Sequence, residues 1–592
     1  MPQLAWPRLA SARPRTPAAA AAVAALGKGR AALSTTPPST STAQLKIDGE
    51  SFDAVVIGAG HNGLTTASYL AKAGKRVLVL ERRHLVGGAA VTEEIVPGYR
   101  FSRASYLAGL LRPRIIEDLD LHRFGLEYLD RDPSSFTPTL PSDPVYTGRS
   151  LLLGADDAAN YASIAQFSQQ DADRFEAYEE MLARVRSLIV PLLDSPLPTW
   201  PPQCRNDLVR ILRLCRELAP KLSPRAVQET YELFLSPAMT VLDRWFESDI
   251  VKTTLATDAV IGALLSPRDI GSAYVLLHHV MGEVNGRPGA WAYVRGGMGS
   301  ISNALRACAE SHGAQVMVNA RVSGVELSDD RSSVTGVTLE DGTTVRTNVV
   351  VSGCAPQHLV GNLLPEHLTG DVANFAQRVQ SQDVSCGAFK INLAINEVPN
   401  FTCCPNRPGE PGPHHRGTIH FESRPDEIHR AFREASEGRP ATRPVIEMTL
   451  PSVVDDTLVD TPGHHVAQLF VQFAPFELEG ASWADEAFKQ RFVDRVIDVV
   501  EEFAPGFRDS IVGMDALSPL DLESIFGLPR GNIFHGALAL HQLGFSRPAP
   551  GFHAHRTPIK GLYMGSAGTH PGGGVMGAPG RNAAEIVLQD LA

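Results

Sequence analysis

The stretch FDAVVIGAGHNGLTTASYLAKAGKRVLVLERRHLVGGAAVT, residues 52–92, decides the fold. Its apolar run at 55–57 is typical of a parallel strand that is buried on both faces. Gly58, Gly60 and Gly63 follow at once, with the spacing of a dinucleotide-binding turn. In such a turn the glycines allow a tight bend, a close approach of backbone to a pyrophosphate, and packing of a helix on the strand.

The residues after this turn complete the unit. The sequence predicts a helix over 64–73 that ends at Gly74, and a second strand over 76–80 with Glu81 at its tip. An acid at this distance from the first glycine accepts hydrogen bonds from ribose hydroxyls. The segment therefore predicts a Rossmann-type α/β domain that binds a dinucleotide.

The residues beyond Glu81 indicate which dinucleotide is bound. Arg83, the pair Gly87 and Gly88, and Thr92 extend the site. This extension resembles the one in FAD-binding proteins of the glutathione-reductase type, so we expect a flavin rather than a nicotinamide. No second GxGxxG follows a strand, and a separate NADPH domain is therefore not expected.

Two further blocks carry a family resemblance. The C-terminal block GLYMGSAGTHPGGGVMGAPGRNAAEIVLQDL, residues 561–591, resembles the flavin motif of the phytoene desaturase and carotenoid isomerase family. The block YVRGGMGSISNAL, residues 293–305, is similar to that family's central segment. The three blocks occur in the family's order and span most of the chain from residue 52 onward. The resemblance implies an oxidoreductase with FAD as its cofactor.

The C-terminal block also makes physical sense by itself. Residues 562–564 predict a buried strand, and the glycines that follow expose bare backbone before a helix that begins near Ala578. The positive end of this helix would favour the negative charge of a reduced flavin. Some amine oxidases on this scaffold join the flavin to a cysteine in this block. No cysteine follows Cys404, so we expect non-covalent FAD.

The predicted cofactor contacts combine these motifs with the resemblance. Val322 enters only through the resemblance, since the matching strand of related flavoproteins gives a backbone contact to adenine. The full set is Gly58, Ala59, Gly60, Asn62, Gly63, Glu81, Arg83, Gly87, Gly88, Val322, Gly568, Val575 and Met576.

The pattern between the motifs predicts how the domains are arranged. Helical periodicity over 155–190 and 206–265 indicates a mostly helical insert. Alternating residues over 315–351 indicate strands that return to the FAD domain through VVVSGCAP, and runs at 389–395 and 465–473 indicate a second sheet. The fold class is therefore α/β, a glutathione-reductase-type FAD-binding Rossmann domain with an inserted mixed α+β substrate domain. We expect a transit peptide and linker at 1–42, FAD-binding parts at 45–150, 296–370 and 531–592, a helical substrate part at 151–295 and a second substrate part at 371–530.

The N-terminal segment predicts an organelle address. Residues 1–42 contain five basic residues, and no acid occurs before Asp48, as in mitochondrial transit peptides. Its apolar core at 18–26 is too short to span a bilayer, although it also fits a secretory signal. We expect a mitochondrial matrix protein, cleaved within 34–42.

The seven cysteines argue against disulfide chemistry. None lies between residues 52 and 103, where a redox pair would face the flavin, and there is no CxxC. Cys403 and Cys404 lie near His414 and His415, but their proline-rich setting matches no zinc spacing, so no metal site is expected.

Candidate catalytic residues are few. His570 lies beside the expected flavin ring and is the one weak candidate for a base. His278 and His279 lie on an apolar helix and are expected to be packed core residues. Lys390 and Arg295 are expected to be solvated or ion-paired.

These features predict an FAD-dependent mitochondrial oxidoreductase that takes hydride from an apolar or amphipathic small molecule and passes electrons to oxygen or a quinone. The alternatives are a non-covalent FAD amine oxidase, and a catalytically weak flavoprotein that regulates a mitochondrial protein partner. The balance of 54 basic and 65 acidic residues, without a basic run, speaks against nucleic acid. Apolar helical segments at 260–265 and 273–281 suggest a peripheral contact with the inner membrane.

Overall fold

The computed structural model describes residue 47 and residues 50–592, apart from 200, 203 and 408. The predicted transit peptide and linker, residues 1–42, lie outside the described residues.

A five-stranded parallel sheet holds the motif at residues 52–92. Its strand order is β11-β2-β1-β15-β21, so strands from the first, middle and last parts of the chain lie side by side. The strands are β1 (Ala54–Ile57), β2 (Val77–Leu80), β11 (Gln315–Met317), β15 (Val350–Ser352) and β21 (Leu562–Met564). The predicted return of VVVSGCAP to this sheet is confirmed, because β15 pairs with both β1 and β21.

Both faces of this sheet are covered, which explains why its strands are apolar throughout. Helix α1 (His61–Lys72) packs against α10 (Gly299–Ser311) and α16 (Ala578–Asp590) on one face. On the other face, the core includes residues of a three-stranded antiparallel sheet and α12 (Gly370–Gln380). That small sheet consists of β12 (Val322–Leu327), β13 (Val334–Leu339) and β14 (Thr344–Arg346).

A seven-stranded mixed sheet forms the second centre of the fold. Its order is β20-β16-β19-β18-β17-β6-β7, and α14 (Glu486–Phe503) packs against it through an aromatic core. The strands are β6 (Ser135–Pro138), β7 (Ser150–Leu153), β16 (Phe389–Ile395), β17 (Thr418–His420), β18 (Val445–Thr449), β19 (His465–Gln472) and β20 (Ile511–Leu517). The predicted strands at 389–395 and 465–473 are β16 and β19. Strand β6 lies inside the segment 45–150 yet pairs in this sheet, while the domain boundaries themselves stay a prediction.

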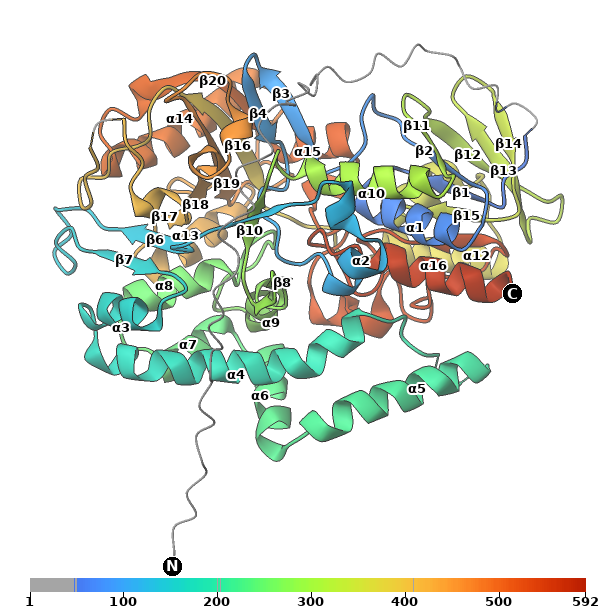
Figure 1. The fold of residues 1–592 in the computed structure, drawn as a ribbon, viewed down its shortest axis with the longest axis horizontal. Coiled ribbons are helices and arrows are strands. Elements are labelled where there is room, and N and C mark those ends of the chain that lie inside the picture. Colours follow the sequence, from blue (N-terminus) through green and yellow to red (C-terminus); the bar gives the residue numbers. More distant parts are fainter. Residues whose placement is uncertain (1–46, 48–49, 200, 203, 408) are drawn as a thin grey trace, which may run out of the picture. The chain divides into compact units, whose positions relative to one another are not determined.

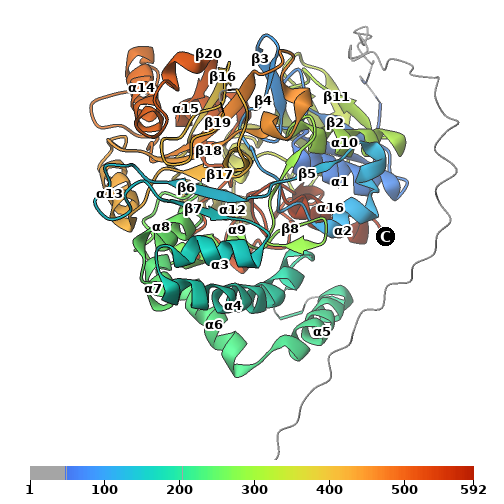
Figure 2. The ribbon, with the colours of Figure 1, turned by 60° about the vertical axis from the view of Figure 1, so that its left-hand side comes forward.

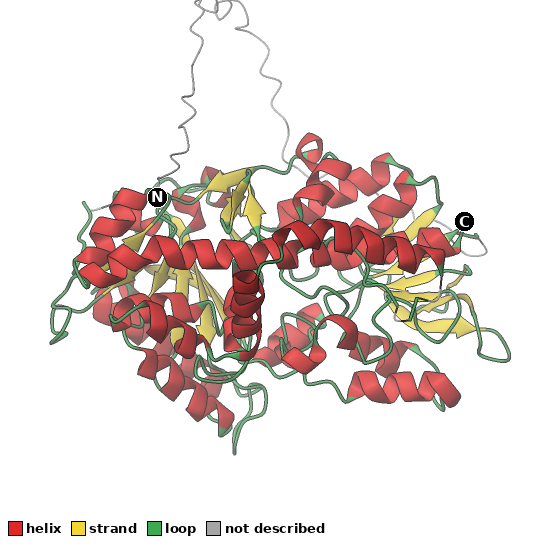
Figure 3. Cartoon of the chain, turned by 90° about the horizontal axis from the view of Figure 1, so that it is seen from below, coloured by secondary structure: helices red, strands yellow, loops and turns green. Residues whose placement is uncertain are grey.

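A helical layer lies below the two sheets in the view of Figure 1. Figure 3, seen from below, shows the strands gathered in two groups with helices across them. This layer is the predicted helical insert, and it consists of α3 (Asp157–Ala165), α4 (Gln169–Leu193), α5 (Arg205–Leu218), α6 (Pro224–Leu235), α7 (Ala238–Trp245), α8 (Asp249–Thr257) and α9 (Ser272–His279). Helices α5 and α6 lie at the outer edge in both Figures 1 and 2.

Shorter elements join these parts. They are β3 (Thr92–Val96), β4 (Tyr99–Ser102), α2 (Pro113–Asp118), β5 (Tyr128–Asp130), β8 (Glu283–Val284), β9 (Arg287–Pro288), β10 (Ala292–Val294), α11 (Pro356–His358), α13 (Pro425–Ser436) and α15 (Pro519–Phe526), with short 3-10 and π turns between them.

The segments predicted to face a membrane are part of the core. Val260, Val275 and Leu277 are fully buried, and they pack among the helices of the insert and against Phe534. The location predicted for a membrane contact is therefore wrong, because tertiary packing covers these apolar faces. Within the described part of the chain, no helix combines the length and the apolar character needed to cross a bilayer.

Candidate active site

A cavity of about 1050 Å³ lies between the two sheets and the helical insert. It begins at the carboxyl ends of β1 and β2, where Ile57 and Leu80 line it, and reaches residues of β17, β18 and α8. The carboxyl edge of a parallel sheet is where α/β proteins place their ligands. The cavity therefore joins the predicted dinucleotide site to the second sheet.

The glycine turn leaves bare backbone facing this cavity. A Cβ added to Gly63 would lie 2.1 Å from the carbonyl oxygen of Gly58, so the close packing of α1 on the turn requires glycine. A Cβ added to Gly60 would meet no protein atom within 4 Å, and Gly60 lines the cavity. Gly60 is also the N-cap of α1, whose exposed N–H groups favour a phosphate. The turn has the open space and the donors that a pyrophosphate needs.

The acid at the tip of β2 is held in place by backbone. The carboxylate of Glu81 accepts one hydrogen bond from the N–H of Ala59 at 2.8 Å and another from the N–H of Arg83 at 2.9 Å. The guanidinium of Arg83 donates to both oxygens of Glu93, and its buried Nη1 has no hydrogen-bond partner among the residues that the structure describes. A buried donor without a partner is rare, so Arg83 has a hydrogen bond to offer to a bound group.

The predicted cofactor residues fall into two sets. Those that line the cavity are Gly58, Gly60, Asn62, Glu81, Arg83, Gly87, Gly88, Val322 and Val575. Four others do not line it: Ala59, Gly63, Gly568 and Met576. Ala59 positions Glu81 and Gly63 positions α1, whereas Met576 accepts a hydrogen bond from the N–H of Arg112. A direct contact of any of these residues with the cofactor stays a prediction.

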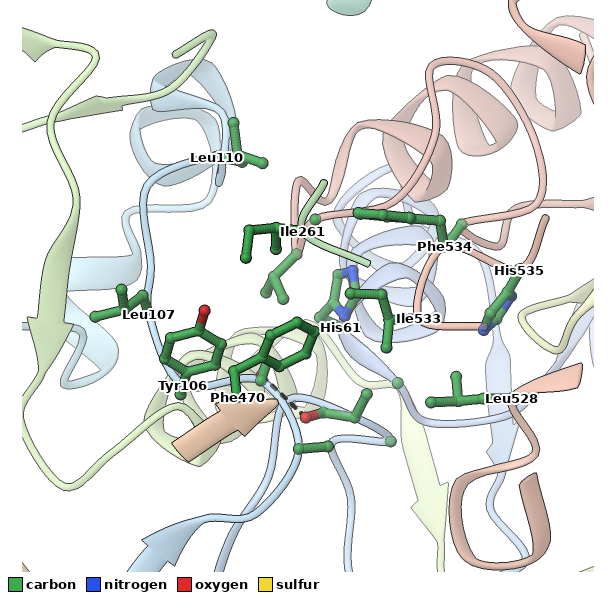
Figure 4. Close-up of a pocket in the computed structure, with 18 of the residues that line it drawn as sticks. His61, Tyr106, Leu107, Leu110, Ile261, Phe470, Leu528, Ile533, Phe534 and His535 are labelled. Carbon is green, nitrogen blue, oxygen red and sulfur yellow. Dashed lines mark hydrogen bonds between the residues drawn. The ribbon is translucent and has the colours of Figure 1, made fainter. Parts of the chain in front are cut away.

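An apolar and aromatic wall follows the glycine turns. The rings of Tyr106 and Phe470 are stacked, with centroids 5.6 Å apart and planes 23° apart. Figure 4 shows this pair in the cavity with Ile261, Ile533 and Phe534 around it, and His61 and His535 further along. Such a wall excludes water and suits the body of an apolar or amphipathic molecule.

The expectation for Lys390 is wrong, because this lysine is neither solvated nor ion-paired. It is 1% exposed, lines the cavity, and donates to Oδ1 of Asn392 at 2.9 Å. Its ammonium group lies over the ring of Tyr106, 5.4 Å from the centroid. Burial lowers the pKa of Lys390 to about 7, so this side chain gains or loses a proton near neutral pH. The expectation for Arg295 is confirmed, since it pairs with Glu127 and Asp456.

His570 does not line the cavity. Its Nε2 lies 2.8 Å from the carbonyl oxygen of Leu192, and burial lowers the pKa of His570 to about 4. The residue connects the helical insert with the C-terminal block, and a catalytic role for it stays a prediction. His278 and His279 are buried on α9, as expected, although His279 also lines the cavity.

The sequence pattern missed two histidines of the cavity. Both His61 and His535 line it, and each has a buried ring nitrogen that no described residue hydrogen-bonds. Burial lowers the pKa of His61 to about 4 and that of His535 to about 3, so both are neutral at pH 7. His61 stood inside the glycine motif, which could have drawn attention to it, whereas nothing in the sequence around His535 connects it with the first motif.

The cysteines form no redox pair. All seven are free, and Cys354 is the one that lines the cavity. Sγ of Cys404 lies 3.5 Å from Nδ1 of His414, which is an isolated contact. Among the described residues there is no group of three or more metal-ligating side chains.

Family models match both halves of this arrangement. The model for an NAD(P)-binding Rossmann-like domain matches residues 56–112, and the model for a flavin containing amine oxidoreductase matches residues 128–397. The fold, the site and these matches therefore define an FAD-dependent oxidoreductase.

Individual relatives refine the assignment. The chain is 47% identical to pyridine nucleotide-disulfide oxidoreductase domain-containing protein 2 of Rattus norvegicus, over 96% of this chain and 100% of the relative. It belongs to the family of that protein. The phytoene desaturase (lycopene-forming) of Pseudescherichia vulneris is 27% identical over 91% of this chain and 99% of the desaturase, so the resemblance to desaturases is confirmed as a distant one. A solved oxidoreductase from Methanosarcina mazei shares the fold, with a TM-score of 0.55 and 16% identity over 91% of this chain and 99% of that one.

Proposed function

We propose that the protein takes hydride from an apolar or amphipathic small molecule, in the manner of the phytoene desaturases. The observation that carries this proposal is the continuity of one cavity from the glycine turns to the Tyr106–Phe470 wall. A finer assignment of the nucleotide-binding domain to the glutathione-reductase type is part of the proposal, supported by the parallel sheet and the small antiparallel sheet that packs on it.

Each part of the cavity has its own task in this proposal. When bound, FAD supplies the hydride acceptor. The glycine turns and Glu81 hold the cofactor, and the aromatic wall orients the substrate and keeps out water. Lys390 is the side chain placed to hold or release a proton at Nζ, since its surroundings bring its pKa near neutrality. Oxygen or a quinone is the proposed electron acceptor.

An amine substrate is the second candidate, and it is supported by the family model of flavin containing amine oxidoreductases over residues 128–397. Anaerobic stopped-flow mixing of the purified holoprotein with panels of lipids, retinoids and amines separates the candidates. Bleaching of the oxidised flavin band by an apolar or amphipathic donor supports the proposal, and bleaching by amines alone selects the amine oxidase. If no donor bleaches the band, the result favours the catalytically weak flavoprotein that regulates a mitochondrial protein partner.

We propose a mitochondrial matrix location on the basis of the basic, acid-poor N-terminal segment. The full chain and a chain without residues 1–40, each fused to a fluorescent reporter, test this proposal in cells. The full chain is expected in mitochondria and the shortened one outside them. Equal delivery of the two would refute it.

A peripheral membrane contact fits a different surface from the one expected. Helix α5 turns polar residues inward, where Arg210 donates to Glu585 and Gln589 of α16. Its outward residues Leu208 and Leu212 are 50% and 61% exposed. The apolar surface continues on α6, and exposed basic residues accompany it, namely Arg205, Arg213, Arg216, Lys221 and Arg225. A basic amphipathic surface of this kind suits an anionic bilayer.

Flotation with vesicles tests this contact. Wild-type protein is expected to float with vesicles that contain anionic lipid and to stay behind with phosphatidylcholine alone, whereas Leu212→Glu is expected to lose binding. Ile270→Glu is the matched control, because Ile270 is an exposed apolar residue outside α5 and α6. Equal flotation of the two variants contradicts the proposal. A dimer that Leu212→Glu dissociates would show that a second copy covers this surface instead.

A further inference from the structure

The cavity has a second, polar end beneath the seven-stranded sheet. It is lined by charged and polar side chains from separate segments: Arg131 after β5, Ser135 on β6, Asp258 at the end of α8, His420 on β17 and Glu447 on β18. Strands β6, β17 and β18 belong to the seven-stranded sheet, on the opposite side of Figure 1 from β1. A cavity that served only a hydrocarbon would have no need of this end.

Some of these groups are already paired. The hydroxyl of Tyr106 donates to Oε2 of Glu447 at 2.6 Å, and Nδ1 of His420 lies 3.7 Å from Oε1 of the same residue. Nη2 of Arg131 donates to the carbonyl oxygen of Ser134 and to Oγ1 of Thr418. The hydroxyl of Tyr106 therefore links the aromatic wall to the polar end.

Three polar atoms or groups at this end have no hydrogen-bond partner among the described residues. Nε of Arg131 and Oγ of Ser135 are buried and make no hydrogen bond with a described residue, and Arg131 is only 6% exposed. The carboxyl group of Asp258, a residue that lines the cavity, makes no hydrogen bond or ion pair with a described residue. Buried polar groups are nearly always hydrogen-bonded, so this set points to an occupant with its own donor and acceptor.

The charges at this end restrict the occupant. Burial raises the pKa of Asp258 to about 7, and burial together with the charge of Asp258 raises that of Glu447 to about 7. An anionic head group would be repelled by these two carboxyls when they are ionised. A cationic head group would be repelled by the guanidinium of Arg131. A hydroxyl group carries no charge, donates to a carboxyl and accepts from a guanidinium.

We infer that the substrate of the proposed reaction is an elongated alcohol, whose hydroxyl head binds Asp258, Arg131 and Ser135 while its apolar body lies along the Tyr106–Phe470 wall. The inference rests on the proposed function, since it names the substrate class of the same cavity. The bond that is oxidised lies in the apolar body, at the opposite end of the molecule from the hydroxyl that positions it.

Matched probes of equal length test the head group. The holoprotein is titrated with 1-octanol, methyl heptyl ether, octylamine and octanoate, and binding is followed as a perturbation of the flavin absorbance spectrum. We expect 1-octanol to bind about tenfold more tightly than the ether, which accepts but does not donate a hydrogen bond. We expect the amine and the carboxylate to bind no better than the ether. Equal affinity for alcohol and ether, or a preference for octylamine, overturns the inference.

Substitutions test whether Asp258 and Ser135 cause the preference for the alcohol over the ether. Asp258→Ala is expected to remove the advantage of the alcohol over the ether, and Ser135→Ala is expected to reduce it. Asp157→Ala is the matched control, because Asp157 is another acid of the cavity lining but lies on α3. If Asp258→Ala fails to fold, Ser135→Ala still decides the question, and an unchanged preference in the folded variant overturns the inference.

A protein that holds flavin and is reduced by a donor, yet shows no preference for the alcohol, refutes this inference alone. A protein that no donor reduces refutes the proposed function.

Discussion

The two ends of the cavity are built in opposite ways. At the β1 end, the site is made of backbone: Gly58, Gly60 and Gly63 follow one another in the chain, and Glu81 is fixed by two backbone N–H groups. At the β18 end, the site is made of side chains that follow β5, lie on β6, β17 and β18, and follow α8. A backbone site leaves a local record in the sequence, and a side-chain site leaves none. The first end is the one that the sequence connects with the cofactor, and the second end is the one that we propose to bind the head of the substrate.

The largest effect is expected at Gly60, where a substitution should weaken FAD binding without lowering the stability of the fold. Gly60 has a φ of −67°, which any residue adopts, and a Cβ there meets no protein atom. We expect Gly60→Trp to fold normally but to bind FAD at least ~100-fold more weakly, because the indole ring occupies the space of the pyrophosphate. Flavin titration and thermal unfolding of the apoprotein measure the two quantities, with Gly60→Ala as the smaller change at the same position. Retention of normal FAD affinity by Gly60→Trp would remove the basis for the site.

The next largest effect is expected at Lys390, whose ammonium group lies over the ring of Tyr106. We expect Lys390→Met to keep its flavin but to be reduced by substrate about 100-fold more slowly, since a residue that holds or releases a proton contributes about this much. The wild-type pH profile of reduction is expected to show a pKa near 7 that the variant lacks. Stopped-flow reduction at pH values from roughly two units below to two units above that pKa measures the rate and its pH profile. Lys560→Met, a change at an exposed lysine, is the control. An unchanged profile in Lys390→Met would assign the titration to another group.

A smaller effect on FAD affinity is expected at Glu81, the acid at the tip of β2. Glu81→Gln keeps an acceptor but loses the charge that strengthens its hydrogen bonds, so FAD affinity should fall about tenfold. Isothermal titration of the apoprotein measures this change. Glu94→Gln, an exposed acid of β3, serves as control and should not change the affinity. A loss confined to the control would contradict the position assigned to Glu81.

The smallest effect is expected at Glu447 of the polar end, and it concerns how the stability of the protein depends on pH. The pKa of Glu447 is raised from 4.5 to about 7, so between these values the folded protein retains a proton that the unfolded chain has released. Stability therefore falls as pH rises through this window. We expect Glu447→Gln to show a shallower decrease of Tm from pH 4.5 to pH 7 than wild type, with the exposed Glu366→Gln matching wild type. Parallel curves for wild type and Glu447→Gln would show that the carboxyl is solvated.

Much of the fold could be predicted from the sequence, because its elements are local. The run at 55–57, the alternation at 389–395 and the strand at 562–564 appear as β1, β16 and β21. The role of Lys390 could not, since a lysine in an alternating strand gives no sign of the ring that will cover it. The burial of residues 260–265 and 273–281 depends in the same way on packing between segments distant in sequence.

The strand β15 lies between β1 and β21, and Thr66 on α1 donates to the carbonyl oxygen of Gly580 on α16 at 2.9 Å. The opening motif thus remains incomplete until residues 562–580 have left the ribosome. We therefore expect coenzyme loading to wait for their synthesis, and a chain ending at residue 560 to be colourless however well its N-terminal half is made. A stop codon just before residue 562 would be as damaging to coenzyme retention as one near residue 60.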